Sequence, residues 1–165
     1  MLEKPYKKIS IQDLCHHAKV GRATFYNHYD DKNDLLENTI AYYSQIAQET
    51  TVHAFVTEDN MDLRSNLIRD YQTAAQYSMV IQALFSVHLP NADFEANMRQ
   101  VLFDKYQVLL ANSEASSLIP EELAVNLYAA NALTVTKYIA YHPDTANIEE
   151  LANFMLQIYN HLFKT

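Results

Sequence analysis

Residues 10–36, SIQDLCHHAKVGRATFYNHYDDKNDLL, decide the fold of this chain. They predict two short helices joined by a tight turn and followed by the start of a third. Ser10 is a typical N-cap, and Asp13 stands three residues on as a capping-box partner. Apolar residues then recur at helical spacing and predict one buried stripe on the first helix: Ile11, Leu14, Cys15 and Ala18.

The second helix is predicted over about residues 22–29, after a turn at residues 19–21 in which Gly21 is an acceptable N-cap. Phe25 and Tyr29 lie four residues apart and are expected to be buried together. The segment is too short and too polar to serve only as core, and it is suited to lie in the major groove of DNA. Its polar side chains are Arg22, Thr24, Tyr26, Asn27 and His28.

The rest of the chain is predicted to be helical as well. Asp31 and Asp34 cap a long helix from residue 32 to about residue 53, and a polar break follows at residues 57–60. A single glycine and four prolines disfavour hairpin-rich folds. The expected fold is all-α, with a helix-turn-helix domain over residues 1–45 and a helical bundle over residues 46–165. Helical periodicity in the bundle extends over about residues 61–77, 79–88, 92–112, 120–141 and 147–163.

Composition limits the class of protein. Hydrophobic residues make up 49% and charged residues 19% of the chain, as in globular proteins. The lone Cys15 excludes an intrachain disulfide and fits a reducing cytoplasm. No apolar run approaches the roughly 20 residues that span a bilayer, and no signal-peptide pattern is present. We expect a cytoplasmic protein with no membrane partner.

The net charge of −8 conceals an uneven distribution. Residues 1–32 hold six basic and four acidic side chains, whereas residues 33–165 hold six basic and sixteen acidic ones. A basic N-terminus on an acidic body would meet phosphates first, because the body is repelled by DNA. The alternative is an ordinary fluctuation of charge along the chain.

Residues 18–29, AKVGRATFYNHY, and residues 31–36, DKNDLL, resemble the signature of TetR-type (TetR/AcrR) transcriptional regulators. The pattern is an alanine and a turn, then Thr-x-Tyr-x-aromatic-or-His, then Lys-x-x-Leu-Leu. The remainder of the chain is similar to that family only in the number and length of its helices.

This resemblance implies a set of DNA-binding residues. Ser10 and Gln12 stand where the first motif helix meets a phosphate or a base edge. The positions that face the major groove, where Arg pairs with guanine and a Thr methyl meets thymine, are Arg22, Ala23 and Thr24. The positions that resemble the phosphate-contacting set are Tyr26, Asn27, His28 and Lys32.

Two features depart from the family pattern. Lys19 replaces the usual turn glycine, so a non-glycine residue is expected to hold an unusual backbone angle. The family also has a full helix before the motif, for which only Met1-Leu2-Glu3 is available here. We expect either that the natural chain is longer, which we favour, or that the DNA-reading unit is destabilised.

The chain also contains twelve tyrosines and seven phenylalanines. In a TetR-like body the central helices enclose a pocket for a small effector, and aromatic walls with hydroxyl tips suit an amphipathic ligand. For any single aromatic residue, plain core packing is the alternative. The candidate lining residues are Tyr71, Tyr77, Phe85, Phe103, Tyr106 and Tyr128.

The helices at about residues 120–141 and 147–163 carry apolar residues on more than one face. This pattern predicts a symmetric four-helix contact in a homodimer, whose two DNA-reading units would meet major grooves about 34 Å apart. The alternative is burial within a monomer.

We therefore predict a dimeric TetR-like transcriptional regulator, a repressor or an activator, that binds a palindromic operator and is controlled by an effector or a partner. One alternative is a co-regulator of the same fold that acts through a protein partner with an impaired DNA-binding unit. Another is a small helical enzyme or ligand carrier. We expect no enzyme activity, cofactor or metal, because neighbouring helical residues such as Cys15, His16 and His17 diverge by about 100° and cannot converge on one ion.

Overall fold

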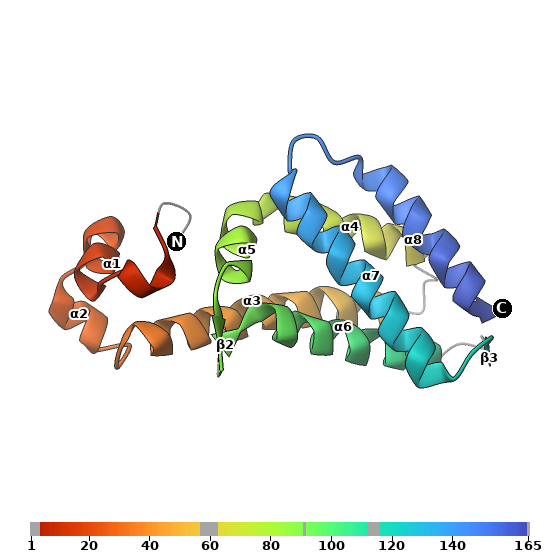
Figure 1. The fold of residues 1–165 in the computed structure, drawn as a ribbon, viewed down its shortest axis with the longest axis horizontal. Helices are drawn as coiled ribbons and strands as arrows, with labels where there is room; N and C mark the ends of the chain where they lie inside the picture. The colour runs from red at the N-terminus through yellow and green to blue at the C-terminus, as the bar shows by residue number, and fades with distance from the viewer. Residues whose placement is uncertain (1–3, 57–62, 91, 112–115, 165) are drawn as a thin grey trace.

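A computed structural model of the chain describes residues 4–56, 63–90, 92–111 and 116–164. Two features considered in the sequence lie outside these residues: the Met1-Leu2-Glu3 segment and the polar break at residues 57–60. The all-α fold is confirmed, since helices account for most of the described chain (Figure 1).

The elements follow the order expected from the sequence. A 3-10 turn, η1 (Tyr6–Lys8), precedes the helices. Two short antiparallel pairs, β1 (His88–Leu89) with β2 (Ala92–Asp93) and β3 (Ser116–Ser117) with β4 (Phe163–Lys164), were not predicted. The α-helices are α1 (Ile11–Ala18), α2 (Arg22–Tyr26), α3 (Lys32–Val56), α4 (Leu63–Gln76), α5 (Ser78–Phe85), α6 (Phe94–Ala111), α7 (Glu121–Tyr141) and α8 (Ile148–Leu162).

Figure 1 shows two parts connected by α3. We call residues 4–31, which hold η1, α1 and α2, the head, and α4 to α8 with the C-terminal part of α3 the body. Three apolar residues of the head, Ile9, Cys15 and Phe25, are buried and lie outside the core of the body, and we call them the head cluster. A much larger continuous core fills the body and includes residues of α3 from Leu36 onward.

The second helix is shorter than predicted. It ends at Tyr26, because the amide of His28 donates to the carbonyl of Phe25, three residues back, at 3.0 Å and so closes a tight turn. Tyr29 is half-buried, and its ring centroid lies 5.6 Å from that of Phe25. The expected pairing of the two rings is therefore present, although the helix around them stops three residues early.

Tyrosine rings pack at the centre of the body. Tyr128 of α7 is fully buried, with its ring edge-on to Tyr106 of α6 at 4.5 Å and to Tyr159 of α8 at 5.8 Å between centroids. Such edge-to-face contacts are favourable beyond the apolar area they bury. Within the described residues, no helix is both long and apolar enough to cross a membrane.

Candidate nucleic-acid interface

A complete capping box fixes the start of α1. The Ser10 hydroxyl accepts from the Asp13 amide at 3.2 Å, and the hydroxyl and amide of Ser10 donate to the Asp13 carboxylate at 2.6 and 2.7 Å. Lys4 adds an ion pair to the same carboxylate at 2.7 Å. The Lys4 ammonium, followed by the donors of Ser10, holds the pKa of Asp13 well below its usual range. Because both Ser10 donors go to Asp13, the structure gives Ser10 a capping role, and Gln12 is the exposed polar residue beside it.

The turn between α1 and α2 has the strained residue expected from the sequence. Lys19 has φ 55° and ψ 38°, and no other non-glycine residue of the described ranges has a positive φ. Its amide and that of Val20 donate back to the carbonyls of His16 and Cys15, which is a common way to end a helix. In this left-handed region a Cβ atom is crowded by the backbone.

Lys19→Gly should therefore stabilise the head, by about 1 kcal/mol in the free energy of unfolding, because glycine adopts this conformation without a steric cost. Lys19→Ala is the matched control, since it removes the same charged side chain and keeps the crowded Cβ. Denaturant unfolding of the two variants measures the difference. Equal stabilities for the two variants would contradict the strain at this turn.

The outward surface of α2 is polar and accessible. Phe25 is the one buried residue of this helix and anchors it to the head. Tyr26 is 48% exposed, and its ring packs edge-on against Phe25 at 5.5 Å. The structure brings the predicted residues of this helix and its following turn onto one exposed segment: Arg22, Ala23, Thr24, Tyr26, Asn27 and His28.

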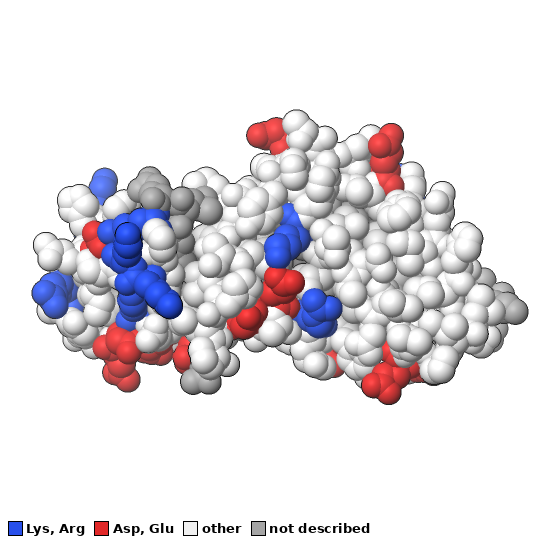
Figure 2. Space-filling view, in the orientation of Figure 1, with Lys and Arg blue, Asp and Glu red and all other residues white. Residues whose placement is uncertain are grey.

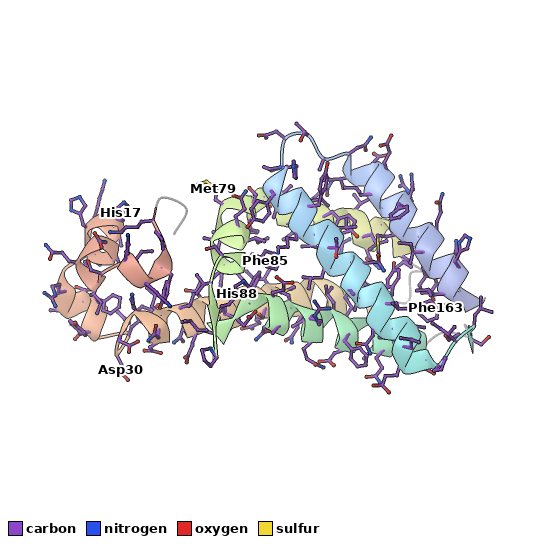
Figure 3. The ribbon with its side chains drawn as sticks, viewed as in Figure 1. His17, Asp30, Met79, Phe85, His88 and Phe163 are labelled. Carbon is purple, nitrogen blue, oxygen red and sulfur yellow. The ribbon has the colours of Figure 1, made fainter. Side chains whose placement is uncertain are left out.

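Charge on the molecule follows the same division. Lys and Arg side chains gather over the head in Figure 2, whereas those of the body stand singly beside acidic ones. His17 and Asp30 project from the head in Figure 3.

Lys32, the last of the predicted DNA-binding residues, has partners inside the protein. Its ammonium lies 3.1, 3.3 and 3.0 Å from the carbonyl oxygens of Tyr6, Lys7 and Ile9. The side chain is half-buried, in contrast to the exposed residues of α2. The sequence prediction grouped Lys32 with the phosphate-contacting residues, and in the structure its ammonium bonds to these three carbonyl oxygens.

Residues 1–39 match the family model of the bacterial regulatory proteins of the tetR family. This N-terminal segment belongs to the TetR family. The match contains the head and about the first third of α3, so the exposed segment of α2 is part of a TetR-type DNA-binding domain. No curated protein and no solved structure matches the chain.

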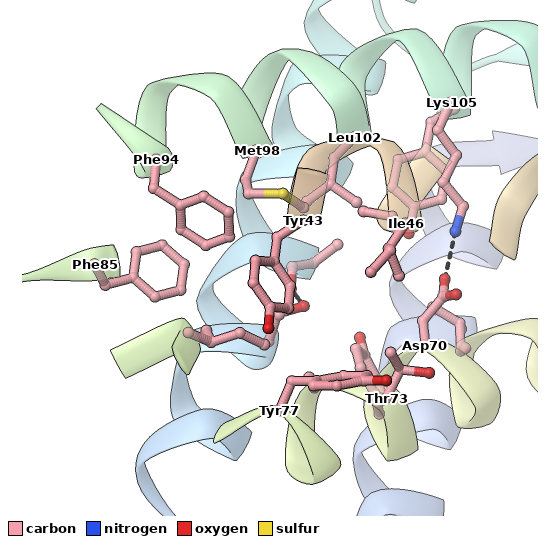
Figure 4. A pocket seen from close by; sticks show the side chains of 18 residues that line it. Tyr43, Ile46, Asp70, Thr73, Tyr77, Phe85, Phe94, Met98, Leu102 and Lys105 are labelled. Atoms are coloured by element: carbon pink, nitrogen blue, oxygen red, sulfur yellow. Dashed lines mark hydrogen bonds and ion pairs between the residues drawn. The ribbon is translucent and has the colours of Figure 1, made fainter. Parts of the chain in front are cut away.

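Behind the TetR-type head, the body contains a cavity of about 80 Å³ between α3, α4, α5, α6 and α7 (Figure 4). Four predicted pocket residues line it, namely Tyr71, Tyr77, Phe85 and Tyr106. Phe103 and Tyr128 are not among its lining residues, and the Tyr128 ring packs edge-on against that of Tyr106. Sequence reasoning missed several lining residues, among them Tyr43, Ile46, Asp70, Phe94, Met98 and Lys105.

An ion pair lies at one end of the cavity and a pair of phenylalanines at the other (Figure 4). Lys105, only 7% exposed, contacts the carboxylate of Asp70, which is 24% exposed. The sequence indicates that both residues face the interior, because each falls at helical spacing among apolar residues. Asp70 lies between Leu67 and Ala74, and Lys105 follows Met98.

The hydroxyl groups of Tyr71 and Tyr128 have no hydrogen-bond partner among the described residues. Burial raises the pKa of Tyr71, Tyr106 and Tyr128 above the usual tyrosine value, and neighbouring phenols and, for Tyr71 and Tyr106, Asp70 raise it further. Among the residues that the structure describes, no group of three His, Cys, Asp or Glu side chains could hold a metal ion. Cys15 is buried, whereas His16 and His17 are exposed.

Proposed function

We propose that this protein is a dimeric transcriptional regulator that binds palindromic operator DNA through α2 and is controlled by a small molecule bound in its body. The observation that carries the proposal is the exposed polar segment of α2, fixed to the head from behind by Phe25. A five-residue helix has no stability of its own, so such a surface is maintained only by the head that presents it.

Within this proposal the residues of the head divide into two roles. Arg22, Ala23 and Thr24 enter the major groove and read base edges, with Arg22 donating to guanine. Tyr26, Asn27 and His28 contact phosphates and fix the position of the head on the duplex. Gln12 adds a contact from α1, while Ser10 keeps the start of that helix in place.

An exposed apolar row on α7 supports the dimer. Leu123, Leu127, Tyr138 and Tyr141 are between 42% and 49% exposed and follow one another at helical spacing. Phe154 of the neighbouring α8 is 53% exposed. Apolar side chains arranged in this way on two packed helices favour a self-complementary contact with a second copy, which would bring two heads to one face of the DNA.

The cavity supports control by a small molecule. Its apolar walls, the Lys105–Asp70 pair and the hydroxyl of Tyr71, which has no hydrogen-bond partner among the described residues, match the usual composition of a ligand site. Its volume of about 80 Å³ is smaller than the roughly 300–1,000 Å³ of most ligand pockets, so a ligand has to move the walls apart. Tyr43 and Ile46 on those walls belong to α3, whose first turn supports the head, and movement there alters the geometry of DNA contact.

Selection from a random duplex library of about 30 base pairs, three helical turns, tests this function. We expect enriched sites with two inverted half-sites centred about one turn apart, and an affinity that falls steeply with salt concentration. Absence of binding to any duplex at low salt would overturn the proposal. It would favour a co-regulator that acts through a protein partner.

Two variants of α2 distinguish base reading from phosphate contact. Arg22→Ala should lose about 1–3 kcal/mol on the selected operator and little on random DNA, because the lost contact is to a base edge. Tyr26→Phe should weaken binding to both duplexes alike. Titrations of each variant with both duplexes measure the two ratios. If Arg22→Ala keeps the operator preference of the wild type, α2 is not the reading helix.

A further inference from the structure

The strongest unexplained feature outside the polar surface of α2 is the environment of Lys32. This residue begins α3 directly after the helix-turn-helix segment, and its side chain reaches back to the residues directly before that segment. We infer that Lys32 is a positioning residue that holds the two ends of the helix-turn-helix together, and not a phosphate ligand. The inference deepens the proposed DNA-binding function and rests on it.

Donor capacity is the first argument. A lysine ammonium has three N–H donors and no acceptor. The three carbonyl oxygens of Tyr6, Lys7 and Ile9 lie at 3.1, 3.3 and 3.0 Å from Nζ, so each proton has a partner within the protein. A phosphate oxygen would have to displace one of them, and the freed carbonyl would then lose a charge-assisted hydrogen bond.

The electrostatic setting favours the same arrangement. The three carbonyls belong to the last turn of η1 and the residue that ends it, where peptide dipoles present their negative ends and a cation is stabilised. The ammonium also lies 4.7 Å from the centre of the Tyr6 ring, within the range of a cation–π interaction. In return, the Tyr6 hydroxyl donates to the carbonyl of Lys32 at 2.9 Å and lies 2.8 Å from Oδ1 of Asn33.

These contacts close a loop around the DNA-binding segment. The carbonyl of Ile9 immediately precedes Ser10, the cap of α1, and Lys32 immediately follows Asp31, whose carboxylate accepts from the Asn33 and Asp34 amides at the start of α3. Everything between them is the helix-turn-helix. Lys32 therefore sets the start of α1 relative to the start of α3, and through both it sets the direction of α2.

We call the three hydrogen bonds from Lys32 to the residues before α1 the clamp. Lysine labelling of the wild-type protein tests it before any substitution. Acetic anhydride in trace amounts should modify Lys32 about tenfold or more slowly than the exposed Lys7 and Lys8, because the ammonium has to leave three charge-assisted hydrogen bonds first. Addition of operator DNA should not protect Lys32 further. If Lys32 reacts as fast as Lys8 in the free protein, or becomes protected only when DNA is added, the inference is overturned.

Lys32→Met and the control Lys8→Met separate the two roles on DNA, since each removes one positive charge from the head. Loss of a phosphate ligand lowers the slope of log affinity against log salt by about 0.9 and leaves the preference for operator over random DNA unchanged. Loss of the clamp should keep the slope and reduce that preference about tenfold, because α2 is no longer held in one direction. A lowered slope with an intact preference in Lys32→Met would overturn the inference.

Amide hydrogen exchange without DNA completes the test. In Lys32→Met the amides of α1 should exchange about tenfold faster than in the wild type, while those of α4 and α7 keep their rates. Unchanged exchange in α1 would contradict the clamp whether or not the protein binds DNA. If the wild type binds no duplex, the proposed function is overturned. The labelling and exchange results still decide the role of Lys32 in that case.

Discussion

The protein should unfold cooperatively in alkali, within about two to three pH units above pH 10, the usual pKa of tyrosine. The pKa values of Tyr71, Tyr106 and Tyr128 are all raised, first of all by burial. Above pH 10 the unfolded chain loses these three protons while the folded chain keeps them. The contribution to stability is therefore fully present below pH 10 and is lost as the pH rises toward the folded values, by about 4 kcal/mol per unit for three groups.

Tyrosinate absorbance and helical circular dichroism, followed in one titration, measure this transition. The buried phenols should ionise in the same step in which the helices unfold. Tyr128→Phe is the matched variant and should lower the dependence on pH by about a third, since it removes one of the three groups. At neutral pH it should cost little, because the deleted hydroxyl has no hydrogen-bond partner among the described residues. Ionisation of all three phenols in a chain that remains helical would contradict the packing of the core.

Phe25→Ala should abolish specific DNA binding while the body stays folded. Phe25 is the single buried residue of α2 and one of three buried apolar residues in the separate cluster of the head. Truncation of a buried phenylalanine costs about 3–5 kcal/mol, which is more than a small cluster can lose and remain ordered. Rapid amide exchange confined to α1 and α2, together with loss of the mobility shift, is the expected result.

Tyr26→Ala provides the control for this change. It removes a ring of similar size from the next position, where the side chain is 48% exposed. It should cost less than about 1 kcal/mol in stability and keep the exchange pattern of the head, although affinity for all duplexes falls. If Phe25→Ala and Tyr26→Ala lose the same amount of stability, Phe25 does not anchor α2.

Much of the fold could be predicted because local signals agreed with one another. The Ser10–Asp13 box, the left-handed Lys19 and the Asp31 cap are decided within a few residues, and the structure confirms each of them. Long periodic stretches such as α7 were predicted within one residue at their start. The end of α2 was not, because the turn after Tyr26 depends on the hydrogen bond from the His28 amide to the carbonyl three residues back.

The candidate site was less predictable where a side chain contacts residues that are far away in the sequence. Lys32 and Ile9 are 23 positions apart in the sequence, so the contacts of the Lys32 ammonium with the carbonyls before α1 cannot be derived from local spacing. The ion pair of Asp70 with Lys105 spans 35 positions, although each residue alone interrupts an apolar stripe. Phe103 and Tyr128 show the converse, because aromatic character did not reveal which side of its helix faces the cavity and which faces the core.

Because α3 is long, a small movement of its wall residues in the body produces a larger displacement at its end in the head. Ile46 on the cavity wall and Lys32 at the head are 14 residues apart on one helix, or about 21 Å at 1.5 Å per residue. A tilt of about 5° at the wall swings the far end by about 2 Å, which exceeds the tolerance of a hydrogen bond to a base edge. If the chain forms the proposed two-fold symmetric pair, the displacements of its two heads add, and a ligand that moves the cavity wall would then change the separation of the two α2 helices.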